Sequence, residues 1–280
     1  MGELTLLEAN DKWDEIKTII LASLVTDTDA EVITGEIDSD VTEGGKYVSK
    51  SFTASNGVEV DYYVYLPTTV KSDKEIPMHL FLWPTRSQGP GGYFNVHGLP
   101  ALLRKGQSAS GIVICPRLGA NEKYTNSMAK ALKELLDSYA AEFNVDENRI
   151  SISGQGGGGQ AAVNIATKYP DYFSKVAGLY SSGATSDYEK YADSKEQAEL
   201  NVASNDILLI KSRGGGDELN TRSAEYTDRL YKKLSKHDNV EVIDNPSPGD
   251  LYGHYLYQNQ FTYDGKTYKN FLEYMFAQTK

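Results

Sequence analysis

The sequence predicts an α/β fold: a mostly parallel central sheet, helices on both faces, and an antiparallel hairpin at the N-terminal end. Strand and helix patterns alternate from residue 78 onward, as a covered parallel sheet requires. Earlier in the chain, Asn56-Gly57 separates two alternating runs, which is a strong hairpin signal. At 280 residues, 40% of them hydrophobic, the chain is long enough for one large core.

The N-terminal segment is expected to be an accessory element. Apolar residues recur with helical spacing between Leu4 and Leu24, and the acidic stretch from Thr26 to Gly45 has few large apolar side chains. We therefore assign residues 1–46 to a helix and an acidic linker. The main domain is assigned to residues 47–280.

The remaining elements follow in order along the chain. Residues 50–54 and 58–66 form the hairpin, and Pro67 ends its second strand. Apolar runs predict further strands at 78–83, 111–115, 149–153, 176–180, 207–210 and 240–243. Periodic stretches predict helices at 98–105, 126–143, 157–168, 187–201, 223–235 and 268–278.

Composition excludes several classes of function. A net charge of −11 disfavours nucleic acid and anionic membranes as partners. No apolar stretch approaches the length of a membrane span, and no signal-peptide pattern is present. Cys115, the single cysteine, lies in an apolar run and is expected to be an inert core thiol. Twenty tyrosines and one cysteine suit an exported, extracellular or cell-surface bacterial protein.

The most constrained stretch is the glycine string Gly154-Gln155-Gly156-Gly157-Gly158. It lies between a buried strand and an alanine-rich helix. Strand, sharp turn and helix make up the nucleophile elbow, G-x-S-x-G, in which a strained turn lifts a serine above the sheet. Here the position of the serine is occupied by Gly156.

The order of elements resembles the α/β-hydrolase fold, and most closely bacterial esterases of the acetyl, feruloyl and esterase-D types. The stretches that carry the resemblance are Tyr63-Val-Tyr-Leu-Pro67, the run from Asp146 to Gly154, and Tyr169-Pro-Asp-Tyr-Phe173. The resemblance spans residue 47 to the end. It implies an acyl-ester substrate or ligand, either a small molecule or a carbohydrate ester.

That resemblance also implies a catalytic triad in the order serine, acid, histidine. Asp217 follows the strand at 207–210, and His254 lies in a loop after the last strand. In such a triad, the histidine takes the proton of the serine and the carboxylate orients the imidazole. The alternative is that Asp217 caps a helix and that His254 is an ordinary loop histidine.

Gly156 closes the covalent route because it has no side chain to attack an ester. Natural loss of activity, an engineered knock-out, and residual chemistry by activated water remain as explanations. A second departure is Pro84, which cannot donate a hydrogen bond where the family supplies an oxyanion-hole N–H. Thr85 and Gly157 are the candidate oxyanion donors. Gln155, Trp83, Arg86 and Tyr255 are the candidate ligand-binding residues.

The same glycines support a rival interpretation. Gly154-x-Gly156-x-x-Gly159 after a strand matches the dinucleotide-binding fingerprint. However, the next strand ends in Leu179-Tyr180-Ser181-Ser182, without the acidic residue that would hold a ribose. We therefore expect no nicotinamide or flavin cofactor. No metal-ligand spacing links the four histidines, and His79, within an apolar strand, is expected to be a satisfied core residue.

Overall fold

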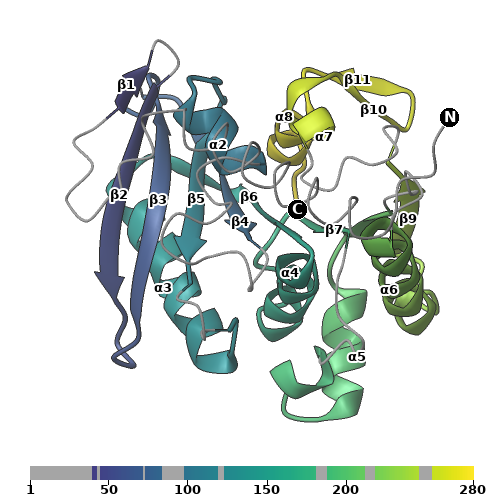
Figure 1. The fold of residues 1–280 in the computed structure, drawn as a ribbon. Helices are drawn as coiled ribbons and strands as arrows, with labels where there is room; N and C mark the ends of the chain where they lie inside the picture. Colours follow the sequence, from purple (N-terminus) through teal and green to yellow (C-terminus); the bar gives the residue numbers. More distant parts are fainter. Residues whose placement is uncertain are drawn as a thin grey trace, which may run out of the picture. The chain divides into compact units, whose positions relative to one another are not determined.

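A computed structural model describes residues 40–42, 45–71, 73–83, 98–118, 123–180, 188–211, 218–245 and 254–280. Side chains at 40–42, 218–224 and 254 are not described. In this part of the chain, nine strands form one sheet (Figure 1). Their order across the sheet is β1 (Asp40–Thr42), β2 (Gly45–Thr53), β3 (Glu59–Pro67), β5 (Ile112–Arg117), β4 (Ile76–Leu82), β6 (Val145–Gln155), β7 (Lys175–Leu179), β8 (Ile207–Lys211) and β9 (Val240–Asp244).

The sheet is antiparallel at one edge and parallel elsewhere, which confirms the predicted fold class. The pairs β1–β2, β2–β3 and β3–β5 are antiparallel, and every pair from β5–β4 to β8–β9 is parallel. The β2–β3 hairpin turns at Asn56-Gly57, where Gly57 has a φ of 78°. Every residue of β4 is buried, as its continuous apolar run predicts for a strand inside the sheet.

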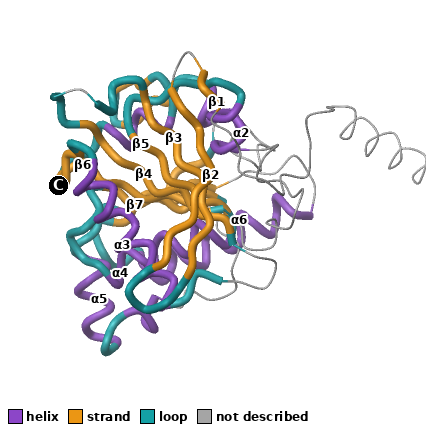
Figure 2. Tube along the Cα trace, turned by 90° about the vertical axis from the view of Figure 1, so that its left-hand side faces the viewer, coloured by secondary structure: helices purple, strands orange, loops and turns teal. Residues whose placement is uncertain are grey.

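Helices cover both faces of the sheet. One face packs against α3 (Asn126–Glu142), α4 (Gly157–Lys168), α5 (Lys195–Ala203) and α6 (Glu218–Leu234). The other packs against α2 (Gly98–Arg104), α7 (His254–Gln258) and α8 (Phe271–Phe276). Figure 1 shows the second group in the upper half of the view and α3, α4 and α5 in the lower half, and Figure 2 shows strands between α2 and α3–α5.

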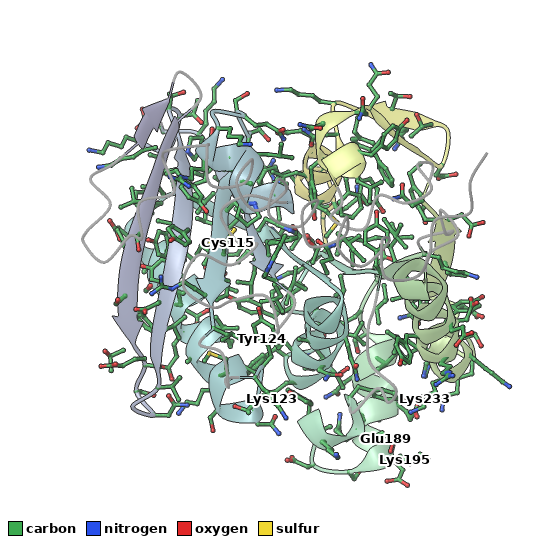
Figure 3. The ribbon with its side chains drawn as sticks, viewed as in Figure 1. Cys115, Lys123, Tyr124, Glu189, Lys195 and Lys233 are labelled. Atoms are coloured by element: carbon green, nitrogen blue, oxygen red, sulfur yellow. The ribbon has the colours of Figure 1, made fainter. Side chains whose placement is uncertain are left out.

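Side chains of each strand alternate between these two helical layers. In β5, Ile112 and Ile114 belong to the core under α3 and α4, whereas Val113 and Cys115 belong to the core under α2 and α8. Cys115, which is labelled in Figure 3, is fully buried, and burial raises the pKa of its thiol well above the usual range. The expected inert core thiol is confirmed, because a protonated, buried sulfur is a poor nucleophile.

Several of the predicted boundaries differ from those of the structure. Residues 40–42 and 45–46, assigned to the acidic linker, are strand residues, because β1 pairs with the start of β2. The predicted helix 187–201 divides into a 3-10 helix η2 (Tyr188–Tyr191) and α5, since Ser194 caps a new helix through the N–H of Gln197. The predicted helix Leu4–Leu24 lies outside the described residues.

The predicted C-terminal helix 268–278 is shorter than expected. Its first residue, Tyr268, belongs to a hairpin of β10 (Phe261–Tyr263) and β11 (Lys266–Tyr268), and α8 begins only after the cap at Asn270. Asp264 and Gly265 form the turn with φ of 47° and 70°. This Asp-Gly pair between two short β-prone runs is the sequence signal that would have found the hairpin.

Candidate active site

The glycine string forms a sharp strand-to-helix turn at the carboxyl end of β6. Gly156 lies between β6 and α4 with φ 57° and ψ −121°, a combination that L-residues rarely adopt. Its N–H donates to the carbonyl of Leu179 on the adjacent strand, at 2.8 Å. A side chain at this position would be held in a strained backbone, at a cost of about 1–3 kcal/mol.

Two flanking glycines allow the turn to pack tightly on its neighbours. A Cβ atom built on Gly158 would lie 2.1 Å from the carbonyl oxygen of Leu82, at the end of β4. A Cβ atom on Gly154 would lie 2.2 Å from the carbonyl oxygen of Gly158. Strand β6, helix α4 and strand β4 therefore approach so closely that only glycine fits at these two positions.

The N-terminus of α4 offers hydrogen-bond donors at this turn. The N–H groups of Gly159 and Gln160 already donate to the carbonyl of Gly156, at 3.0 and 3.3 Å. The N–H groups of Gly157 and Gly158 come earlier and have no acceptor within the helix. The first turn of α4 contains no acidic residue, so its positive end is not neutralised from within the helix.

The structure brings four of the predicted site residues to one edge of the sheet. Leu82 of β4 is in register with Gly154 of β6, so Trp83 and Gln155 follow at the ends of adjacent strands, beside Gly156 and Gly157. Trp83 has no exposed surface and Gln155 is 4% exposed. Both were predicted as binding residues.

Of the other predicted site residues, only some lie in the described part of the chain. Thr85, Arg86 and Asp217 lie outside the described residues. His254 was expected in a loop, but in the structure it is the first residue of helix α7. Tyr255, which follows it, is 38% exposed.

A buried polar network that the sequence analysis did not assemble lies below the turn. The ring nitrogens of His79 contact the hydroxyls of Ser151, at 2.8 Å, and Ser153, at 2.7 Å. The Ser153 hydroxyl also lies 3.4 Å from that of Tyr257, on α7. Gln107 donates to the backbone carbonyl of Tyr257 at 2.8 Å. These contacts hold α7, which begins at His254, against the sheet.

The distance between His79 and Ser153 is that of a catalytic serine and its base, but their surroundings are not those of an active site. Both side chains are fully buried, and burial lowers the pKa of His79 to about 3. A serine that no substrate can reach cannot attack an ester. The expectation of a satisfied core histidine is confirmed.

Tyr180 and Asn245 form a second feature that sequence reasoning missed. Tyr180 directly follows β7 and has a φ of 49°, which is unusual for an aromatic residue, and its hydroxyl accepts a hydrogen bond from Asn245. The backbone N–H groups of Tyr180 and Asn245 donate to Ile210 and Lys211 of β8, at 2.9 and 2.7 Å. Together they hold the end of β8 from both sides, and no local sequence pattern announces this arrangement.

Among the described residues, no group of three or more His, Cys, Asp or Glu side chains could hold a metal ion. No helix within the described ranges is long and apolar enough to cross a membrane.

Comparisons with known proteins find similarity to esterases and to a related hydrolase. Residues 112–240 match the family described as "Putative esterase". A ferulic acid esterase structure is similar with a TM-score of 0.58 at 18% identity, covering 84% of this chain and 100% of the other. For a thermostable esterase the values are 0.56 and 18%, covering 84% of this chain and 63% of the other. An S-formylglutathione hydrolase from Staphylococcus aureus has a TM-score of 0.52 at 18% identity, covering 75% of this chain and 93% of the other. No curated protein sequence is significantly similar.

Proposed function

Because this chain has the α/β-hydrolase fold and matches an esterase family over residues 112–240, we propose that a site at its elbow binds acyl esters without serine-type turnover. The ester is a small molecule or is carried on a carbohydrate. The observation that carries the proposal is Gly156 at the apex of the elbow, where the fold places a nucleophile.

The backbone of Gly156 is that of an elbow apex, and its flanking glycines make the close contacts that the motif requires. What is missing is the hydroxyl. Without it no acyl-enzyme can form at this position. The rest of the proposed machinery consists of Asp217 and His254 as acid and base, and the N–H groups of Gly157 and Thr85 as oxyanion donors.

In this proposal the remaining candidate residues support the site. Trp83 and Gln155 stand at the ends of β4 and β6, next to the turn, and Arg86 and Tyr255 are the further candidate contacts to the ligand. Weak hydrolysis by water activated at His254 is compatible with this arrangement, because a general base does not require the serine.

The decisive experiment is Gly156→Ser, with hydrolysis of p-nitrophenyl acetate as the readout. If the site was disabled at this residue alone, the new hydroxyl is activated by His254 and turnover appears. Gly156→Ala is the matched control, since it introduces the same backbone strain without a hydroxyl. A second control, Gly156→Ser with His254→Ala, removes the base.

The outcomes separate the histories of the site. Brisk hydrolysis in Gly156→Ser points to a recent or engineered loss of the serine. Hydrolysis by Gly156→Ser that is about 10²–10³ slower than in an intact esterase, as the loss of one oxyanion donor causes, points to a decayed enzyme in which Pro84 cannot supply that donor. No hydrolysis in a folded Gly156→Ser variant rules out a latent esterase site and leaves a binding module. Hydrolysis by the unmodified protein that His254→Ala abolishes would assign the reaction to activated water.

A further inference from the structure

Three side chains of β6 form a polar row on one face of the sheet. Ser151, Ser153 and Gln155 occupy alternate positions, and Ser153 lies 3.4 Å from the hydroxyl of Tyr257, so the row faces helix α7. All three are buried, with Gln155 4% exposed. Because buried polar groups are almost always hydrogen-bonded, each member of the row needs a partner.

The lower two members of the row have partners and the uppermost does not. Ser151 and Ser153 contact the two ring nitrogens of His79. The Oε1 atom of Gln155 is buried and has no hydrogen-bond partner in the described part of the chain. An unpaired buried acceptor destabilises a protein, so its retention beside a candidate site suggests that a ligand supplies the donor.

The unpaired acceptor stands next to a set of donors. Gln155 precedes Gly156, and the first N–H groups of the twelve-residue helix α4 follow it. The cap position of α4 makes no side-chain hydrogen bond and its first turn has no acidic residue. Along the chain, an unpaired buried acceptor therefore comes directly before Gly156 and the first N–H groups of α4 come directly after it, with no side chain at Gly156 itself.

We propose that the site at the elbow preferentially binds a carboxamide. The amide carbonyl accepts from the N–H groups at the start of α4, and the amide N–H donates to Oε1 of Gln155. An ester offers the same carbonyl but has no donor, so it leaves Gln155 unpaired. The proposal rests on the proposed function, because it requires that acyl compounds bind at this site, and it involves no bond cleavage.

Two isosteric probes test the preference. Acetanilide and phenyl acetate differ only in an N–H in place of an ester oxygen. We expect the unmodified full-length protein to bind acetanilide about tenfold more tightly in calorimetric titrations, which corresponds to one hydrogen bond. In Gln155→Met, which keeps the length of the side chain, the preference for acetanilide over phenyl acetate falls below about twofold.

Ser153→Ala is the matched control on the same row. It removes a hydroxyl that already has a partner, so it lowers the melting temperature but keeps the amide preference. Gln155→Met removes an unpaired acceptor, so it raises the melting temperature by about 2–4 °C. Gln155→Leu serves the same purpose if the Met variant does not fold.

Each contrary result has a distinct meaning. Equal affinity for the two probes in the unmodified protein overturns the carboxamide proposal and leaves the proposed acyl-binding site in place. An amide preference that survives in Gln155→Met, or a melting temperature that falls in both Gln155 variants, also overturns it. If neither probe binds to any variant, the proposed function itself fails, and the carboxamide proposal fails with it.

Discussion

We expect the protein to lose stability between pH 6.5 and pH 5 because of one buried imidazole. His79 has no exposed surface, and burial lowers the pKa of its ring from 6.5 to about 3. The folded protein therefore keeps His79 neutral, whereas the unfolded chain takes up a proton below pH 6.5. Since that proton binds only the unfolded state, stability is highest above pH 6.5 and falls as the pH drops towards 3.

The size of the effect follows from the pKa difference. At pH 5, which is 1.5 pH units below the unfolded value, the loss is about 2 kcal/mol, at about 1.36 kcal/mol per pH unit. The carboxyl groups of Asp61, Asp146 and Glu199 also have lowered pKa values, but their ordinary values are 3.8 to 4.5. Their contributions disappear mainly below pH 4.5, so the interval from pH 6.5 to pH 5 isolates the histidines.

The assay is urea unfolding at pH 7, 6 and 5, with His79→Gln as the comparison. Glutamine does not titrate, and its amide still offers a donor and an acceptor to Ser151 and Ser153. The other three histidines are present in both proteins, so the difference between the two pH slopes belongs to His79. If the slopes are equal, His79 is not held neutral by burial and the argument for a sealed polar network is wrong.

Two further predictions concern the glycine string. Gly158→Ala should destabilise the fold by about 3 kcal/mol or more in urea unfolding, because its Cβ would meet the Leu82 carbonyl at 2.1 Å. The control Gly57→Ala, with open space but a φ of 78°, should cost only about 1–2 kcal/mol. Added NAD should leave the melting temperature unchanged, because β7 ends at Leu179 without a carboxylate for the ribose; a rise of several degrees would favour dinucleotide binding instead.

Much of the fold and part of the candidate site could be predicted from local patterns. Helix α4 begins and ends at the predicted residues, Gly157 and Lys168, because the glycine string and the alanine-rich run are both local signals. The hairpin β10–β11 was missed because the three-residue strands are too short for a periodic pattern. Helix α6 begins five residues before its predicted start at Ser223, since polar residues in a first turn give no apolar period.

The sequence by itself determined the order of elements, the strand–turn–helix at the elbow and the absence of a nucleophile at Gly156, since these depend on residues close together in the chain. Only the tertiary structure decided the partners of the buried polar groups. His79 and Ser153 are 74 residues apart and meet because β4 lies beside β6. It also left the Oε1 atom of Gln155 without a hydrogen-bond partner among the described residues, whereas Ser151 and Ser153 on the same strand have one. A hydrogen bond requires atoms within about 3 Å, and such a distance between remote residues is fixed by packing.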